Sequence, residues 1–387
     1  MSGCLSELRK FVAPEFVFGQ GASELTARYA LNFEARRVLL VSDPGIMEAG
    51  WTAKVADNLR GAGVESVLFD AVSANPRDTE VMAGADVYRG RRCEAIVAVG
   101  GGSAMDCAKG IGVVTTNKAH ILSLEGVDKV PVPGPPLICL PTTAGSAAEV
   151  SQFAIITDTT RKVKIAIVSK TMIPDTALLD PELTASMPPY LTACTGLDAL
   201  THAIEAYVSN ASFAITDHFA LASMRRVAAN LLQAIAKPQD LTARSEMLLA
   251  SLEAGLAFSN AILGAVHAMA HSLGGLFNLP HGECNALLLP HVVGYNFSAC
   301  PKRFRDVGEA LGLSLTGLPD EEARAVLVAG IEEIRRAAGV TRTLSDIGVR
   351  RSDLAQLAAN AACDPCLLTN PRKASAKDLE RIYEEAL

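Results

Sequence analysis

The sequence predicts an α/β domain over residues 1–188 followed by an all-helical domain over residues 189–387. In the first half, short aliphatic and β-branched runs alternate with segments of helical periodicity, which is typical of a parallel sheet covered on both faces. From about Leu183, Ala/Leu-rich stretches with helical spacing continue to the C-terminus. Pro188-Pro189 stands at this change of texture and predicts the domain boundary.

The expected strands are short apolar runs bounded by turn residues. We predict them at 37–43, 65–69, 95–99, 137–140, 153–156, 163–168 and 177–179. Helices are expected between the early strands at 51–61 and 78–89. The second half is predicted to hold helices at 191–209, 213–236, 241–258, 260–277 and 320–338.

Composition argues against nucleic acid or a membrane as the main partner. The formal net charge is −7, and no Lys/Arg cluster occurs. Apolar stretches are interrupted before the roughly 18 residues that a membrane span needs. The N-terminal segment lacks the layout of a signal peptide, and the 9 cysteines, one of them Cys4, are scattered as reduced thiols would be. Cys363 and Cys366 form a lone CxxC, which we interpret as structural. We expect a cytoplasmic protein.

A glycine-rich turn follows the strand expected at 95–99. Gly100-Gly101-Gly102-Ser103 precedes a helix expected at 104–112. Such a turn can bind a phosphate, because glycines let the backbone approach the ligand and the helix start offers free N–H groups. Ser103 is expected to cap the helix or bind a phosphate oxygen, and Asp106 to lie in the first turn. The alternative is a plain tight turn, since the run is not a GxGxxG motif.

Two more polar segments end predicted strands. Asp43 ends the strand expected at 37–43, and a carboxylate at this place can accept hydrogen bonds from a ribose diol and repel a 2′-phosphate. It lies upstream of the glycines rather than about 20 residues after them, so the topology is not that of the standard dinucleotide fold. Thr142, Thr143 and Ser146 follow the strand at 137–140. Together these strand ends indicate a dinucleotide lying across one edge of the sheet.

Histidine spacing gives the strongest signal in the chain. Asp198 and His202 stand four residues apart in a helical run, as do His267 and His271, and His281 follows in a Pro-His-Gly loop. Residues at this spacing share one helix face and can bind one cation. A carboxylate with imidazoles and no thiolate suits Fe(II), Zn(II) or Mn(II). The remaining histidines lack such partners and are expected to be structural; they are His120, His218 and His291.

These segments, in this order, resemble one family from about Val12 to Tyr383, the iron-containing (group III) alcohol dehydrogenases. The resemblance rests on GGGSAMDCAK, PTTAGSAAEVSQFAIIT, TGLDALTHAIEAYVS, GAVHAMAHSLGGLFNLPHGECNALLLPHV and the late Asn370-Pro371-Arg372. Within the family, the sequence looks most similar to the branch of lactaldehyde reductase, 1,2-propanediol oxidoreductase and bacterial ethanol dehydrogenases. The resemblance implies an α/β dinucleotide-binding domain and an all-α metal domain, as in dehydroquinate synthase.

The resemblance also implies cofactors and residue roles. It implies NAD, Fe(II) and commonly a dimer or larger homo-oligomer. The implied metal ligands are Asp198, His202, His267 and His281, with His271 as a proton relay. Phe258 matches an aromatic lid over the substrate, and Phe153 falls where lactaldehyde reductases carry a smaller polar residue. The implied cofactor contacts are Asp43, Gly100, Gly101, Gly102, Ser103, Asp106, Thr142, Thr143, Ser146 and Lys164.

The predicted function is reversible hydride transfer between NAD and a small primary alcohol or diol. One alternative is a zinc-dependent polyol dehydrogenase on the same scaffold, because the ligands alone do not separate zinc from iron. Another is an NAD-using lyase that resembles dehydroquinate synthase. That lyase would need basic residues near the metal for a phosphorylated, carboxylated substrate, and Arg225, Arg226 and Lys237 are not near the ligand motifs. A third is a catalytically inactive metal-binding protein.

Overall fold

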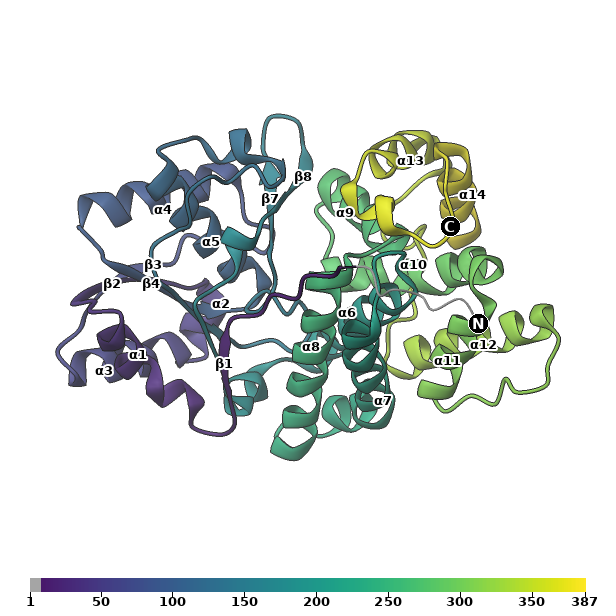
Figure 1. The fold of residues 1–387 in the computed structure, drawn as a ribbon, viewed down its shortest axis with the longest axis horizontal. Helices are drawn as coiled ribbons and strands as arrows, with labels where there is room; N and C mark the ends of the chain where they lie inside the picture. The colour runs from purple at the N-terminus through teal and green to yellow at the C-terminus, as the bar shows by residue number, and fades with distance from the viewer. Residues whose placement is uncertain (1–7) are drawn as a thin grey trace.

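The computed structural model describes residues 8–387, so Cys4 lies outside the described residues. Figure 1 shows a mixed part, coloured purple to blue, beside a helical part, coloured green to yellow. Every strand precedes residue 180, and every regular element after it is helical. The prediction of an α/β part followed by a helical part is therefore confirmed.

The main sheet is entirely parallel and has the strand order β1-β9-β6-β4-β2-β3. Its strands are β1 (Glu15–Phe18), β2 (Arg37–Val41), β3 (Glu65–Phe69), β4 (Ala95–Gly100), β6 (Leu137–Pro141) and β9 (Thr176–Leu179). A second, smaller sheet has the order β5-β8-β7, formed by β5 (Gly126–Val127), β7 (Phe153–Asp158) and β8 (Val163–Val168). In it, β7 and β8 form an antiparallel pair.

The inner strands of the main sheet, β2, β4, β6 and β9, are buried on both faces because they are apolar at nearly every position. In β2, Val38 and Leu40 belong to one core cluster, whereas Leu39 and Val41 belong to another on the opposite face. Figure 1 shows α4 and α5 on one side of these strands and α1 and α3 on the other. The helices of this part are α1 (Thr26–Asn32), α2 (Pro44–Glu48), α3 (Trp51–Gly61), α4 (Asp78–Gly90) and α5 (Gly102–Asn117), with 3-10 turns at Ala22–Leu25, Ile121–Leu124, Lys170–Met172 and Pro181–Ser186.

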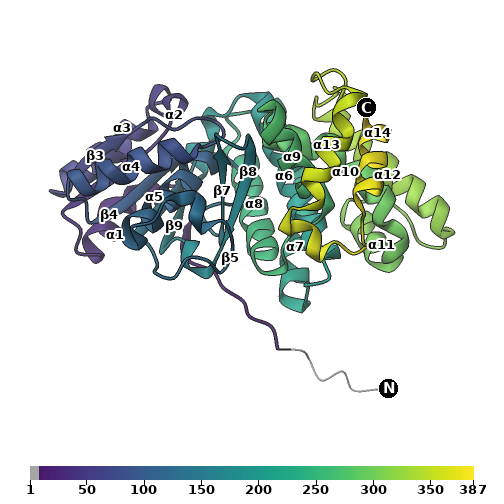
Figure 2. The same ribbon diagram turned by 90° about the horizontal axis from the view of Figure 1, so that it is seen from above.

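The helical part packs long helices around α6, which leads from the sheet into the bundle (Figure 2). Its helices are α6 (Pro189–Val208), α7 (Ala214–Ala236), α8 (Leu241–Ala261), α9 (Ala265–Phe277), α10 (His281–Asn296), α11 (Pro301–Ala310), α12 (Asp320–Ala337), α13 (Leu354–Ala362) and α14 (Ala376–Ala386). Shorter 3-10 turns occupy Phe297–Ala299, Arg351–Asp353 and η7 (Pro365–Thr369).

The predicted start of the helix at 260–277 is wrong. Helix α8 continues to Ala261, α9 begins only at Ala265, and the two helices are bent by 101° relative to each other. At the break, Ile262 has φ 64 and ψ −172, a conformation that glycine favours and that cannot continue a helix. The Ile262 N–H still donates to the Phe258 carbonyl at 2.7 Å, which closes the last turn of α8.

Within residues 8–387, no single helix is long and apolar enough to cross a membrane. Only the bent pair of α8 and α9 meets the length and composition criteria, and only when both helices are taken together.

Candidate active site

A cleft of about 910 Å³ opens between the carboxyl ends of the sheet strands and helices α6, α8, α9 and α10. It collects nearly all of the residues that the sequence singled out, from the glycine turn to the histidines. Gly100 is the exception, because it is buried at the end of β4, opposite Pro141 of β6. The predicted residues that line the cleft are Asp43, Gly101, Gly102, Ser103, Asp106, Thr142, Thr143, Ser146, Phe153, Lys164, Asp198, His202, Phe258, His267, His271 and His281.

The glycine turn packs closely against the threonine loop. A Cβ at Gly101 would lie 3.1 Å from Thr143 Cγ2, and one at Gly102 would lie 2.8 Å from Ser146 Oγ. Gly102 is the first residue of α5, and no side chain caps this helix start. Side chains at these glycines would therefore separate the two loops and cover the free N–H groups of α5.

Two details of the predicted turn are wrong, the capping role offered for Ser103 and the place of Asp106 in the first turn; phosphate binding by Ser103 stays a prediction. Ser103 does not cap α5, because its hydroxyl donates to the Ala74 carbonyl at 2.5 Å and so ties α5 to the segment before α4. Asp106 lies beyond the first turn, because α5 begins earlier than predicted. Its Oδ2 accepts the Ile155 N–H at 3.1 Å. Burial raises the pKa of Asp106 to about 6, although Lys109 opposes that shift.

Asp43 uses one carboxylate oxygen to cap α2. Its Oδ1 accepts the N–H groups of Gly45 and Ile46 at 3.0 and 3.2 Å. The other oxygen, Oδ2, would lie 3.2 Å from a Cβ at Gly100, so the glycine leaves room for this carboxylate. Burial raises the pKa of Asp43, and the two backbone N–H groups oppose the shift.

At the other wall of the cleft, three helices bring four candidate metal ligands together. Asp198 and His202 come from α6, His267 from α9 and His281 from α10, and one ligand atom of each lies within 4.8 Å of the others. The Nε2 atoms of the three histidines lie 4.0, 3.8 and 3.9 Å from Asp198 Oδ1.

The prediction that His281 lies in a loop is wrong, because His281 is the first residue of α10. Pro280 precedes it with φ −60, a value that suits the entry into a helix. The next residue, Gly282, allows α10 to approach α6 closely, since a Cβ there would lie 2.4 Å from the Cys194 carbonyl oxygen.

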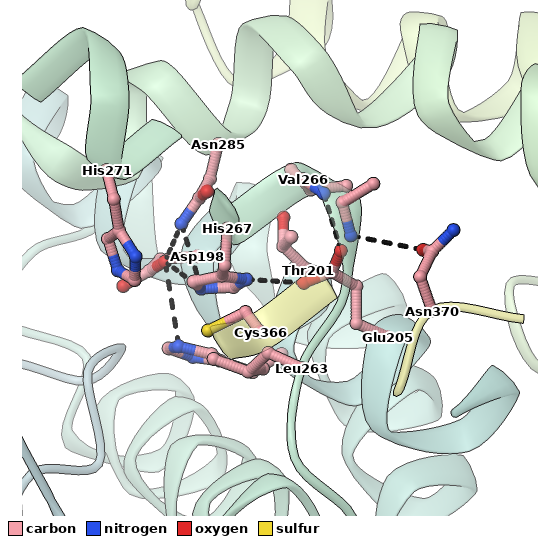
Figure 3. Close-up of polar contacts among 12 residues, drawn as sticks. Asp198, Thr201, Glu205, Leu263, Val266, His267, His271, Asn285, Cys366 and Asn370 are labelled. Carbon is pink, nitrogen blue, oxygen red and sulfur yellow. Dashed lines mark hydrogen bonds and ion pairs between the residues drawn. The ribbon is translucent and has the colours of Figure 1, made fainter. Parts of the chain in front are cut away.

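The electrostatics and hydrogen bonding of this cluster fit a divalent cation. Burial alone would raise the pKa of Asp198, but the surrounding histidines lower it, so the carboxylate is ionised. Asn285 Nδ2 lies 2.7 Å from Asp198 Oδ1, and 3.1 and 3.2 Å from Nε2 of His267 and His281 (Figure 3). Among the described residues, Asn285 Oδ1 and His281 Nδ1 are buried without a partner. One carboxylate and three imidazoles, with no thiolate, suit Fe(II), Zn(II) or Mn(II).

His271 stands beside this cluster rather than in it. Its Nδ1 lies 2.8 Å from Asp364 Oδ2, and its ring stacks on that of His281 with centroids 5.3 Å apart. Burial would raise the pKa of Asp364, but His271 and the Cys366 N–H lower it to about 2. The Asp364 carboxylate therefore orients the His271 ring.

Aromatic and aliphatic side chains cover the metal end of the cleft. The Phe258 ring stacks on the His202 ring with centroids 4.3 Å apart, and the centroid of the Phe153 ring lies 5.8 Å from that of Phe258. Leu263 extends this apolar wall, and Lys164 is a basic residue beside it. Burial lowers the pKa of the Lys164 ammonium. The pocket beside the candidate metal ligands is therefore mostly apolar.

Sequence reasoning missed three polar residues that contact the histidines. Glu205 binds His267, Asp364 binds His271, and Asn285 contacts both His267 and His281. Helical spacing could have found Glu205, which follows His202 by three residues, and Asn285, which follows His281 by four. No local spacing could have found Asp364, which is 93 residues from its partner.

A glycine turn at a helix start and a cluster of candidate metal ligands face each other across one cleft, an arrangement typical of a metal-dependent oxidoreductase. Comparison with known proteins defines the class further. The chain matches the family model for iron-containing alcohol dehydrogenase over residues 13–181. It matches the C-terminal model of the same family over residues 192–387.

Whole-chain relatives agree with these matches. The chain is 42% identical to 1,3-propanediol dehydrogenase of Citrobacter freundii over 95% of this chain and 96% of that one. It is 37% identical to the NAD-dependent methanol dehydrogenase of Bacillus methanolicus, over 97% and 99%. A solved structure of 1,3-propanediol oxidoreductase superposes with a TM-score of 0.95 at 40% identity, covering 98% of this chain and 100% of that one. This chain belongs to the iron-containing alcohol dehydrogenase family and is an oxidoreductase.

Proposed function

We propose that the protein interconverts a small primary alcohol or diol and its aldehyde, with NAD(H) as the redox partner and Fe(II) as the metal. The observation that carries the proposal is the meeting of the glycine turn and the Asp198 cluster in one cleft. The 1,3-propanediol and methanol dehydrogenases among its relatives support the choice of substrate class and of NAD. Residues 1–188 would form the NAD-binding domain, and residues 189–387 the metal- and substrate-binding domain.

In this proposal, the α/β wall binds and orients NAD. The free N–H groups at the start of α5 receive the pyrophosphate, and the threonine loop lies beside it. Asp43 has one oxygen left for the adenosine ribose and would repel a 2′-phosphate. Lys164 and Asp106 line the cleft and would contact the nicotinamide ribose.

The helical wall holds the metal and the substrate. Asp198, His202, His267 and His281 would be the ligands, with iron as the family metal and zinc or manganese compatible with the same donors. When bound, the metal supplies a Lewis acid and NAD supplies the acceptor or donor of hydride. Phe153, Phe258 and Leu263 exclude water from the substrate carbon and leave room for a short aliphatic chain.

His271 is proposed to carry the proton that the alcohol loses. Its Nδ1 is held by Asp364 at 2.8 Å, so Nε2 is the nitrogen that is free to accept a proton. The ring lies against His281, which places it beside the ligands without being one of them. Oxidation then releases one proton through His271, and reduction takes one up by the same route.

We further propose a cytoplasmic homodimer or larger homo-oligomer. The described cysteines carry no disulfide, as expected for a reducing compartment. The sheet ends at β1, whose Phe16 side chain is 41% exposed and could meet a second copy. Light scattering after size-exclusion chromatography would give the number of subunits.

The experiment that tests the function is NADH oxidation by short aldehydes. Protein purified anaerobically and freed of metal would be assayed before and after loading with Fe(II), Zn(II) or Mn(II). We expect turnover that depends on added metal, is highest with iron, and is much lower with NADPH. Absence of turnover with all three metals, in protein that still binds NADH, would contradict the proposal.

A further inference from the structure

The N-terminus of α9, which carries His267, is capped by two side chains from elsewhere in the chain (Figure 3). Glu205 of α6 accepts the Val266 N–H at 2.7 Å. Asn370, which follows η7, accepts the Ala265 N–H at 3.1 Å. A Cβ at Gly264, the residue before α9, would lie 2.9 Å from the acceptor oxygens of both side chains. The approach of these two acceptors therefore requires a glycine at this position.

The second carboxylate oxygen of Glu205 contacts His267. Oε2 lies 2.5 Å from His267 Nδ1, and both side chains are buried, with exposed fractions of 4% and 1%. Because Nδ1 donates to the carboxylate, the lone pair of the neutral ring is on Nε2. That atom lies 3.8 Å from Asp198 Oδ1, inside the ligand cluster. The Glu205 contact therefore selects the tautomer and ring orientation that a metal ligand needs.

Only a carboxylate can satisfy both contacts of Glu205. Two donors, the Val266 N–H and the His267 Nδ1–H, converge on one side chain. A glutamine has one acceptor oxygen and one NH₂ group. If its oxygen faced Val266, its NH₂ would face His267 Nδ1 and favour the tautomer with the proton on Nε2. If its oxygen faced His267, the Val266 N–H would meet another donor.

The charge of Glu205 also suits a dication. Asp198 and Glu205 place two carboxyl groups in a buried site, and imidazoles that bind a metal do so in the neutral form and add no charge. A divalent cation bound by the four ligands would bring the net charge to zero, which lowers the cost of burying it. A neutral side chain at position 205 would leave one positive charge uncompensated.

We propose that Glu205 is a positioning residue that holds His267 in the metal-binding tautomer, with Asn370 as a second anchor for the start of α9. Asn370 anchors the start of α9 through the Ala265 N–H. Its amide is itself held in place, because it exchanges two hydrogen bonds with the Asn296 amide, each 2.9 Å long. This gives the Asn370-Pro371-Arg372 segment a physical role in the site. The inference rests on the proposed metal site and adds a requirement for the Glu205 carboxylate.

The test compares Glu205→Gln with Glu253→Gln as a matched control. Glu253 is a mostly buried carboxylate of α8 that pairs with Arg226 and is not among the residues that line the cleft. Each metal-free protein would be titrated with Co(II) against a competing chelator, and its visible absorption spectrum recorded. We expect Glu205→Gln to weaken Co(II) binding about 10- to 100-fold and to change the spectrum. Glu253→Gln should match the wild type in both measurements.

The outcomes separate this inference from the function on which it rests. If wild-type protein fails to bind Co(II), the proposed metal site is wrong and the inference falls with it. If the wild type binds Co(II) and Glu205→Gln binds it with equal affinity and an unchanged spectrum, only the role of Glu205 is overturned. If Glu205→Gln does not fold, Glu205→Asp decides, because it keeps the charge but is too short for both donors. Wild-type affinity in that variant would overturn the proposal.

Discussion

The three candidate ligand histidines differ in how their second ring nitrogen is held. Nδ1 of His267 is held by the Glu205 carboxylate, and Nδ1 of His202 lies 3.2 Å from the Gly145 carbonyl oxygen. Nδ1 of His281 has no partner among the described residues. Because the partner of the second nitrogen fixes the tautomer, His267 and His202 would be the more rigid ligands in the proposed site, and His281 would adjust as a metal enters.

At this scale, we predict that His267→Ala removes metal binding and turnover together. The substitution takes away one ligand and leaves the Glu205 carboxylate buried without its imidazole partner. Metal content after dialysis and NADH-linked turnover should both fall at least about 100-fold. His218→Ala, which removes an exposed histidine that neither lines the cleft nor belongs to the ligand cluster, is the control. Substantial turnover in His267→Ala would refute the ligand assignment.

Glu149 allows a pH-dependent prediction. This carboxyl group is buried, its Oε1 has no partner among the described residues, and burial raises its pKa from 4.5 to about 7. Between pH 4.5 and about 7, the folded state keeps a proton that the unfolded state releases, so the free energy of unfolding falls as the pH rises. This loss of stability is complete above about pH 7.

Glu149→Gln should therefore stabilise the protein at pH 8 by up to roughly 3 kcal/mol, and the gain should vanish near pH 4. Chemical unfolding of the metal-free protein at several pH values would measure the difference in unfolding free energy. Glu332→Gln is a useful comparison. Burial alone would raise the pKa of Glu332, but its bonds to Arg335 and Arg336 lower it, so this variant should show no such gain. A gain for Glu149→Gln that does not depend on pH would refute the account.

Among the elements, the sequence predicted those with a strong local pattern. The strands β3 and β8 match their predicted bounds, because each is an apolar run bounded by turn residues. Helical spacing, which depends only on local geometry, singled out Asp198, His202 and His267, whereas the set of four candidate ligands that includes His281 came from the family resemblance. The break between α8 and α9 was not predictable, because isoleucine favours neither a turn nor positive φ, and the side chain of Ile262 packs against the core of the helical part. The same holds for Asp364 and Asn370, whose partners are distant in sequence.

For helix α9, we predict that Gly264→Ala weakens both the fold and the metal site. The added methyl group would push apart Glu205 and Asn370, the two side chains that cap the helix. We expect a loss of about 1–3 kcal/mol in the unfolding free energy of the metal-free protein, and weaker Co(II) binding. Gly61→Ala at the end of α3 is the control, since a Cβ there meets nothing within 4 Å. Equal behaviour of the two variants would contradict the proposed cap.

In the whole molecule, the α/β part and the helical part share a hydrophobic core, and a hydrogen bond between two residues that line the cleft also connects them. One core cluster includes Phe153 and Leu179 of the strands together with residues of α6, α8 and α9, so packing continues across the predicted boundary at residues 188/189. At the mouth, Asn75 Nδ2 donates to Asn278 Oδ1 at 2.7 Å, between the segment before α4 and the end of α9. Both asparagines line the cleft. We predict that the cleft opens at this contact while the shared core stays packed.

Removing that contact should speed the release of NADH. In Asn75→Ala, the exposed hydrogen bond is lost, which is worth about 0.5–1 kcal/mol and so corresponds to about a two- to fivefold faster dissociation rate. Stopped-flow fluorescence of bound NADH would measure this rate, and steady-state assays would show whether release limits turnover. Asn360→Ala is the control, because Asn360 accepts an equally exposed hydrogen bond from Gln356 on the surface of α13. If both variants release NADH at the wild-type rate, the contact does not hold the cleft closed, and the shared core alone sets its opening.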